Sequence, residues 1–94
     1  MIIDNPSEYR FIRFERSRNR MKKYDAILLN KSTGRERRVS FGAKGYEHYK
    51  DRALGLYKQL DHNDPKRREL YRQRHRGENN RKFSSGYFAW RYLW

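Results

Sequence analysis

The sequence predicts a small single α+β domain. A β-hairpin, two-stranded or extended to three strands by the N-terminal segment, is packed by two or three short helices, the last of them an aromatic C-terminal helix. Three observations support this fold class. Residues 24–41 alternate around a central turn, as the strands of a hairpin do. Asp64-Pro65 is typical of a helix start. Six of the last twelve residues are aromatic.

The composition combines few aliphatic side chains with many rings. Leu, Ile, Val and Phe account for 17 of 94 residues and the net charge is +13, values typical of disordered chains. The 15 aromatic residues favour a compact core instead, because each ring buries roughly 150–250 Å². We therefore expect a marginal fold that a partner completes.

The hairpin is expected at residues 24–29 and 35–41, with residues 30–34 as the turn. Tyr24, Ala26 and Leu28 share one face of the first strand, and Val39 and Phe41 share one face of the second. A two-stranded ribbon is marginal alone, so it needs the helices or a third strand. That strand would come from residues 8–15, whose apolar side chains alternate: Tyr9 and Phe11 on one side, Ile12 and Phe14 on the other.

We expect the chain to divide into a basic N-terminal arm at residues 1–21 and an α+β domain at residues 22–94. The run Arg16-Ser-Arg18-Asn-Arg20 contains no apolar residue. Such a run is either solvated surface or a segment that follows phosphates, and both interpretations stay open.

Residues 41–46 end the second strand with two glycines. Lys44 lies in this loop and is a candidate anion ligand, although a structural turn is the commoner role of such a loop. Residues 46–60 carry apolar side chains at intervals of three and four, which predicts a helix weakened at Gly55.

A further helix is predicted from Pro65 to about residue 76, because Asp64 is a natural N-cap and Gly77 a natural stop. Leu70 and Tyr71 are expected to face the core. The rest of the helix is strongly basic. The anion-binding candidates are its six cations together with those upstream: Arg16, Arg18, Arg20, Lys22, Lys23, Lys44, Lys66, Arg67, Arg68, Arg72, Arg74 and Arg76.

The tail places rings at intervals of three and four along one stripe of a helix. One interpretation makes this stripe the lid of the core, and the other makes it a docking surface for a partner protein or a membrane. The candidate interface residues are Phe83, Tyr87, Trp90, Tyr92 and Trp94, with Phe83, Tyr87, Trp90 and Trp94 on the stripe.

The sequence contains few residues in arrangements typical of a catalytic site. No cysteine is present, so thiolate metal sites are excluded. A nuclease site would need His62 and His75 near one ion, but a straight helix separates Pro65 from His75 by about 15 Å. We expect His62 to join the helix cap and His75 to pack beside Tyr71, and the role of His48 stays open. The prediction is a protein that is not an enzyme and has no metal or cofactor.

Three motifs occur in order: Phe41-Gly-Ala-Lys-Gly-Tyr46, then Arg67-Arg68 with Tyr71 and Arg74-His75, then the final Leu93-Trp94. Together they resemble a family of short basic proteins encoded by large double-stranded DNA viruses of algae and amoebae, over residues 22–94. That family has no established activity, so the resemblance implies no site residues. It implies a viral context, in which small basic proteins usually belong to the virion.

Two functions fit these features. The first is a virion structural protein of the minor capsid type, which cements capsid subunits or links the shell to an anionic surface. The alternative is sequence-independent nucleic-acid binding for genome packaging. A third interpretation places Trp90, Tyr92 and Trp94 at the headgroups of an internal virion membrane. The expected partners are therefore capsid proteins, genomic DNA or membrane lipids, with no small-molecule substrate. The chain has no signal peptide and no membrane span, so a soluble protein is expected before assembly.

Overall fold

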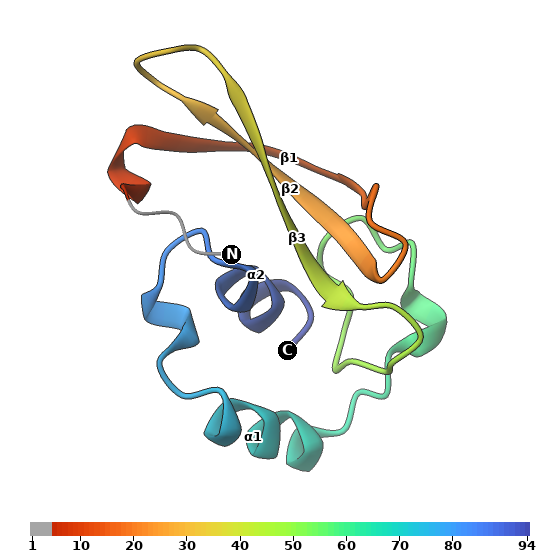
Figure 1. The fold of residues 1–94 in the computed structure, drawn as a ribbon. Coiled ribbons are helices and arrows are strands. Elements are labelled where there is room, and N and C mark those ends of the chain that lie inside the picture. The colour runs from red at the N-terminus through yellow and green to blue at the C-terminus, as the bar shows by residue number, and fades with distance from the viewer. Residues whose placement is uncertain (1–4) are drawn as a thin grey trace.

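A computed structural model describes residues 5–94. A three-stranded antiparallel sheet carries α2 on one face, and α1 lies farther out (Figure 1). The predicted α+β class, the third strand and the aromatic C-terminal helix are confirmed. The elements in chain order are the 3-10 turn Pro6–Glu8, β1 Tyr9–Arg16, β2 Lys22–Asn30, β3 Glu36–Ala43, the 3-10 turn Lys58–Leu60, α1 Pro65–Arg74, the 3-10 turn Glu78–Asn80 and α2 Ser85–Tyr92.

The sheet has the order β1-β2-β3, so β2 is central and β1 and β3 are its edges. Tyr24 pairs with Phe41 and Ala26 with Val39. These four side chains and Leu28 are fully buried on the face that α2 covers. The alternation expected for the hairpin is therefore confirmed.

The alternation expected along β1 was wrong. The register against β2 shifts between Phe11 and Arg13, where Ile12 is the extra residue of a β-bulge. Because of this shift, Phe11 and Phe14 both pack against the core. Ile12 itself is 37% exposed.

The segment assigned to the arm contains a strand. Residues 9–16 form β1, and residues 17–21 are the short connection to β2. Residues 1–4 of the arm lie outside the described part of the chain.

The core is built around Phe88 of α2. Its ring centroid lies 5.5 Å from that of Phe41, 6.0 Å from Phe14 and 5.9 Å from Phe83. Ser84 caps the helix by accepting a hydrogen bond from the backbone N–H of Tyr87. The predicted stripe of Phe83, Tyr87, Trp90 and Trp94 is not the buried side of the helix. In α2 and its C-cap, the residues buried in the core are Phe88, Ala89 and Leu93.

The helix expected at residues 46–60 was wrong. Its backbone donors bond to distant acceptors: His48 N–H to the oxygen of Leu60, and Arg52 N–H to that of Tyr92. The carboxylate of Asp51 folds the following loop, accepting from Ala53 N–H, Tyr57 N–H and the hydroxyl of Tyr24. Gly55 has a φ of +73°, which a helix does not allow. A buried carboxylate therefore outweighed a weak helical pattern.

The basic helix is confirmed as α1. The carboxylate of Asp64 accepts hydrogen bonds from the N–H groups of Lys66 and Arg67, and Gly77 follows the helix with a φ of +92°. The expected burial of Leu70 was wrong, since it is 48% exposed. No residue of α1 is fully buried.

We expect Phe88→Ala to lower the free energy of unfolding by about 3–5 kcal/mol, because it removes the ring that the other core rings contact. This is a large share of the roughly 5–15 kcal/mol that small domains possess. Urea unfolding followed by circular dichroism measures it. Leu70→Ala is the matched control and should change stability by less than about 0.5 kcal/mol. Equal effects of the two substitutions would contradict the assigned core.

Candidate functional site

The helix α1 is attached to the rest of the fold mainly through Trp94. The indole ring stacks on Tyr71 with a centroid distance of 4.2 Å and an interplanar angle of 3°. Arg68 Nε and Arg72 Nη2 donate to the main-chain oxygen of Trp94 at 2.7 and 3.2 Å. Because α1 buries no residue completely, these contacts fix its position.

Two histidines support this attachment, as expected from the sequence. The N–H of Asp64 donates to His62 Nδ1 at 3.0 Å, so His62 takes part in the helix cap. The His75 ring stacks on Tyr71 at 4.1 Å. His62 also lies 5.2 Å from the indole of Trp94.

A cleft of about 970 Å³ lies between the end of the β2–β3 hairpin, α1, the turn at Glu78–Asn80 and α2. We call it the basic cleft. Its acidic residues are already engaged: Glu47 pairs with Arg67 at 3.0 Å and Glu78 with His75 at 3.1 Å. The cations that line the basic cleft are Lys22, Lys23, Arg67, Arg74 and Arg81.

Three of these cations are available to a ligand. Lys22, Arg74 and Arg81 make no side-chain hydrogen bond or ion pair within residues 5–94. Since each of the two carboxylates has a cationic or imidazole partner, the surplus charge of the basic cleft is positive. Guanidinium and ammonium groups in such a concave site favour phosphate or carboxylate ligands.

Close packing shapes the floor of the basic cleft. Gly42 has a φ of +80°, and a Cβ built on it would lie 2.8 Å from Leu93 Cδ1 and 3.2 Å from Lys23 Cδ. A side chain at this position would therefore displace the end of the tail or the stem of Lys23. The glycine lets β3 approach both.

A buried polar relay lies beneath the basic cleft. Lys23 Nζ lies 3.0 Å from His48 Nδ1, and His48 Nε2 lies 2.6 Å from Asp61 Oδ1. Lys23 is 2% exposed and His48 is fully buried. The same carboxylate oxygen of Asp61 accepts from the N–H of Asp51 at 2.8 Å. The relay joins β2 to the two ends of the loop that precedes α1.

The relay sets the protonation of its members. Burial lowers the pKa of Lys23 to about 8, against the opposing charges of Asp51 and Asp61. Burial also lowers the pKa of His48, and the Lys23 ammonium adds to that effect. At neutral pH a charged Lys23 therefore donates to a neutral His48, whose Nε2–H donates to Asp61. The arrangement places a fixed cation under the basic cleft.

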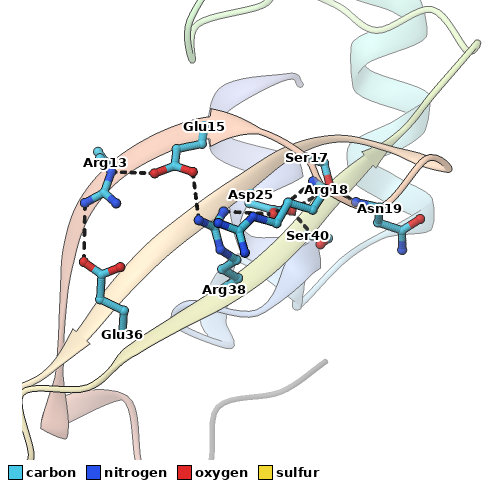
Figure 2. A network of polar contacts seen from close by, with 9 residues as sticks. All are labelled: Arg13, Glu15, Ser17, Arg18, Asn19, Asp25, Glu36, Arg38 and Ser40. Atoms are coloured by element: carbon cyan, nitrogen blue, oxygen red, sulfur yellow. Dashed lines mark hydrogen bonds and ion pairs between the residues drawn. The ribbon is translucent and has the colours of Figure 1, made fainter.

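A second polar network covers the other face of the sheet (Figure 2). Asp25 is 1% exposed and accepts 2.6 Å hydrogen bonds from the hydroxyls of Ser17 and Ser40. Arg38 bridges Asp25 and Glu15 at 3.3 and 2.9 Å. Burial raises the pKa of Asp25, but the hydrogen bonds from both serines and from the Arg18 N–H lower it overall. These contacts tie the three strands together.

The structure divides the anion-binding candidates predicted from the sequence. Four of them, Lys22, Lys23, Arg67 and Arg74, meet in the basic cleft. Lys44 is exposed beside it in the turn after β3. Others lie elsewhere: Lys66 at the exposed start of α1, Arg68, Arg72 and Arg76 along a smaller groove beside Trp90, and Arg16, Arg18 and Arg20 at the end of β1 and in the connection after it.

The interface candidates of the tail are mostly in contact with the core. Phe83 is buried in it, and Tyr87, Tyr92 and Trp94 are partly buried against it. Trp90 is half-buried under the guanidinium of Arg72, 5.0 Å from its ring centroid.

Sequence reasoning missed three parts of the site. Arg81 lies in the polar segment between Gly77 and Phe83, and the local sequence holds no sign that it reaches the basic cleft. The partnership of His48 with Lys23 and Asp61 joins residues far apart in the chain. The network around Asp25 had a signal, since Asp25 lies between Tyr24 and Ala26 and Ser40 between Val39 and Phe41, so that alternation turns both away from the core-facing side chains.

Within residues 5–94, no group of three or more His, Cys, Asp and Glu side chains has an arrangement that could hold a metal ion. Among the described helices, none has the length and apolar character needed to cross a bilayer.

The fold and the site define a small α+β protein with a basic cleft. Over residues 12–53 the chain is similar to DUF5754, a family of unknown function. The matched segment runs from β1 to the loop after β3 and includes Lys22, Lys23, Tyr46 and His48, whereas α1 and α2 lie beyond it. Comparisons with curated proteins and with solved structures found no match.

We expect the free energy of unfolding to decrease as the pH falls below about 6.5. The pKa of His48 is lowered from 6.5 by folding, so the unfolded chain binds a proton that the folded chain does not. Urea unfolding at several pH values between about 7.5 and 5 measures this slope. In His48→Gln the slope should be smaller. The remainder comes from His62, whose pKa burial also lowers, and near pH 7.5 from Lys23, whose pKa burial lowers to about 8. An unchanged slope in this variant would contradict a neutral His48.

Proposed function

We propose that the protein binds nucleic acid without reading its sequence, through phosphate contacts in the basic cleft. The observation that carries the proposal is the gathering of five cations around one cleft that is lined by two carboxylates, of which Glu47 already pairs with Arg67. Guanidinium and ammonium groups contact phosphates in the same way at any sequence.

The charge of the whole chain supports this partner. A net charge of +13 on 94 residues attracts a polyanion from a distance and raises the association rate. Phosphate contacts by Lys and Arg release condensed counterions, which makes the affinity strongly salt-dependent. The resemblance to viral proteins suggests a viral genome as the nucleic acid and the virion as the place of binding.

Salt titration of binding tests the proposal. The unmodified protein should lose affinity steeply between about 50 and 200 mM salt, and replacing Lys22, Arg74 and Arg81 together by Gln should reduce the slope of log K against log salt by about one per cation. Fluorescence anisotropy with a labelled oligonucleotide measures both.

The matched control removes the same charge at the other end of the sheet. Arg10, Lys31 and Arg35 lie near the β2–β3 turn, at the end of β2 opposite to the one that lines the basic cleft. Replacing these three by Gln should leave most of the slope intact. Equal losses in the two triple variants would show that total charge, not the basic cleft, determines binding.

A second candidate function is that of a minor capsid-type structural protein. A groove of about 450 Å³ beside α1, lined by Pro65, Trp90 and the stems of three arginines, favours it, because aromatic rings and Arg dominate protein interfaces. A membrane partner receives less support, since Tyr92 and Trp94 pack against the core.

Particle fractionation separates the two candidates. A capsid component should stay with the shell after the genome is removed, and Trp90→Ala should reduce its incorporation while the protein remains folded. A genome-binding protein should leave with the nucleic acid, and Trp90→Ala should not alter that behaviour.

A further inference from the structure

Tyr46 differs from every other aromatic residue of the chain. All 15 lie within residues 5–94, and 14 are buried or partly buried. Tyr46 is 72% exposed, and its side chain makes no hydrogen bond, ring contact or ion pair with another described residue. In a chain that uses its rings for the core, an unused ring on the surface requires an explanation.

The backbone of Tyr46 is held in place although its ring is free. Lys23 Nζ, itself fixed by the buried relay, donates to the main-chain oxygen of Tyr46 at 2.7 Å. Gly45 precedes it with a φ of +90°, and the N–H of Tyr46 reaches the oxygen of Ala43 at 3.4 Å. The fold therefore presents this ring from a defined turn.

Tyr46 belongs to the wall of the basic cleft. Tyr46 lines it together with the three unpaired cations Lys22, Arg74 and Arg81. An exposed aromatic platform next to a positively charged groove is the combination that single-stranded nucleic-acid sites share: cations follow the backbone and rings stack on bases.

We propose that Tyr46 stacks on an unpaired base, so that the basic cleft is a site for single-stranded rather than duplex nucleic acid. This inference rests on the proposed function and adds the class of nucleic acid to it. In a duplex the base faces are covered by their neighbours, and a ring reaches them only if a base step is unstacked. In a single strand they are open, and every base offers one, so no sequence is preferred.

A comparison of the affinities for single-stranded and duplex nucleic acid tests the inference. Anisotropy titrations would use a labelled single strand of about 15 nucleotides and the duplex of the same length. We expect Tyr46→Ala to weaken single-strand binding about fivefold or more and to leave duplex binding unchanged. Tyr46→Phe keeps the ring and should bind as the unmodified protein does.

Met21→Ala is the matched control. Met21 is 74% exposed, and its main-chain oxygen accepts from the N–H of Lys44, so it lies close to the same turn but carries no ring. Its substitution should leave both affinities unchanged. If Tyr46→Ala weakens neither form, or weakens both equally, the stacking role is wrong while phosphate binding stands. If neither form binds at low salt, the proposed function fails, and the inference fails with it.

Discussion

The contact between Phe88 and the sheet is the constraint on which the rest of this structure depends. With 12 Leu, Ile and Val residues in 94, the chain has too few aliphatic side chains for an ordinary core, and rings take their place. Once α2 lies against Phe41 and Phe14, the residues that follow have fixed positions. Trp94 then meets Tyr71 and holds α1, which forms one wall of the basic cleft. The site is therefore a product of aromatic packing in the tail.

Local signals predicted much of the fold. Alternation predicted β2 and β3, and the Asp64 cap predicted the start of α1, because strand periodicity and helix caps act within a few residues. The helix ends at Arg74, two residues before the predicted end, and Gly77 instead precedes the 3-10 turn Glu78–Asn80. The failures have tertiary causes. A bulge at Ile12 reverses the expected alternation along β1. The carboxylate of Asp51 turns a weakly helical segment into a loop, since its hydrogen bonds are made to a strand and to its own loop.

The candidate site was predictable only in part. Basic runs predicted Lys22, Lys23, Arg67 and Arg74 as anion-binding candidates, because clustered charge is visible in the sequence. The sequence did not show that these four residues share one cleft with Arg81, because three separate segments must fold before the five cations meet. For the tail, the sequence left two interpretations open, a lid of the core and a docking surface. In the structure most of its rings pack in or against the core, which is short of aliphatic side chains.

The open sides of the sheet have a consequence for the behaviour of the protein in concentrated solution. Both β1 and β3 are unpaired along one side in the described chain, and such strands invite copies to add to the sheet. Here β1 carries three arginines and β3 two, and β1 is also bent by its bulge, so mutual repulsion opposes fibre-like self-association. A polyanion cancels that repulsion. Excess nucleic acid should keep copies apart, whereas a small amount would bring neutralised sheets together as a precipitate.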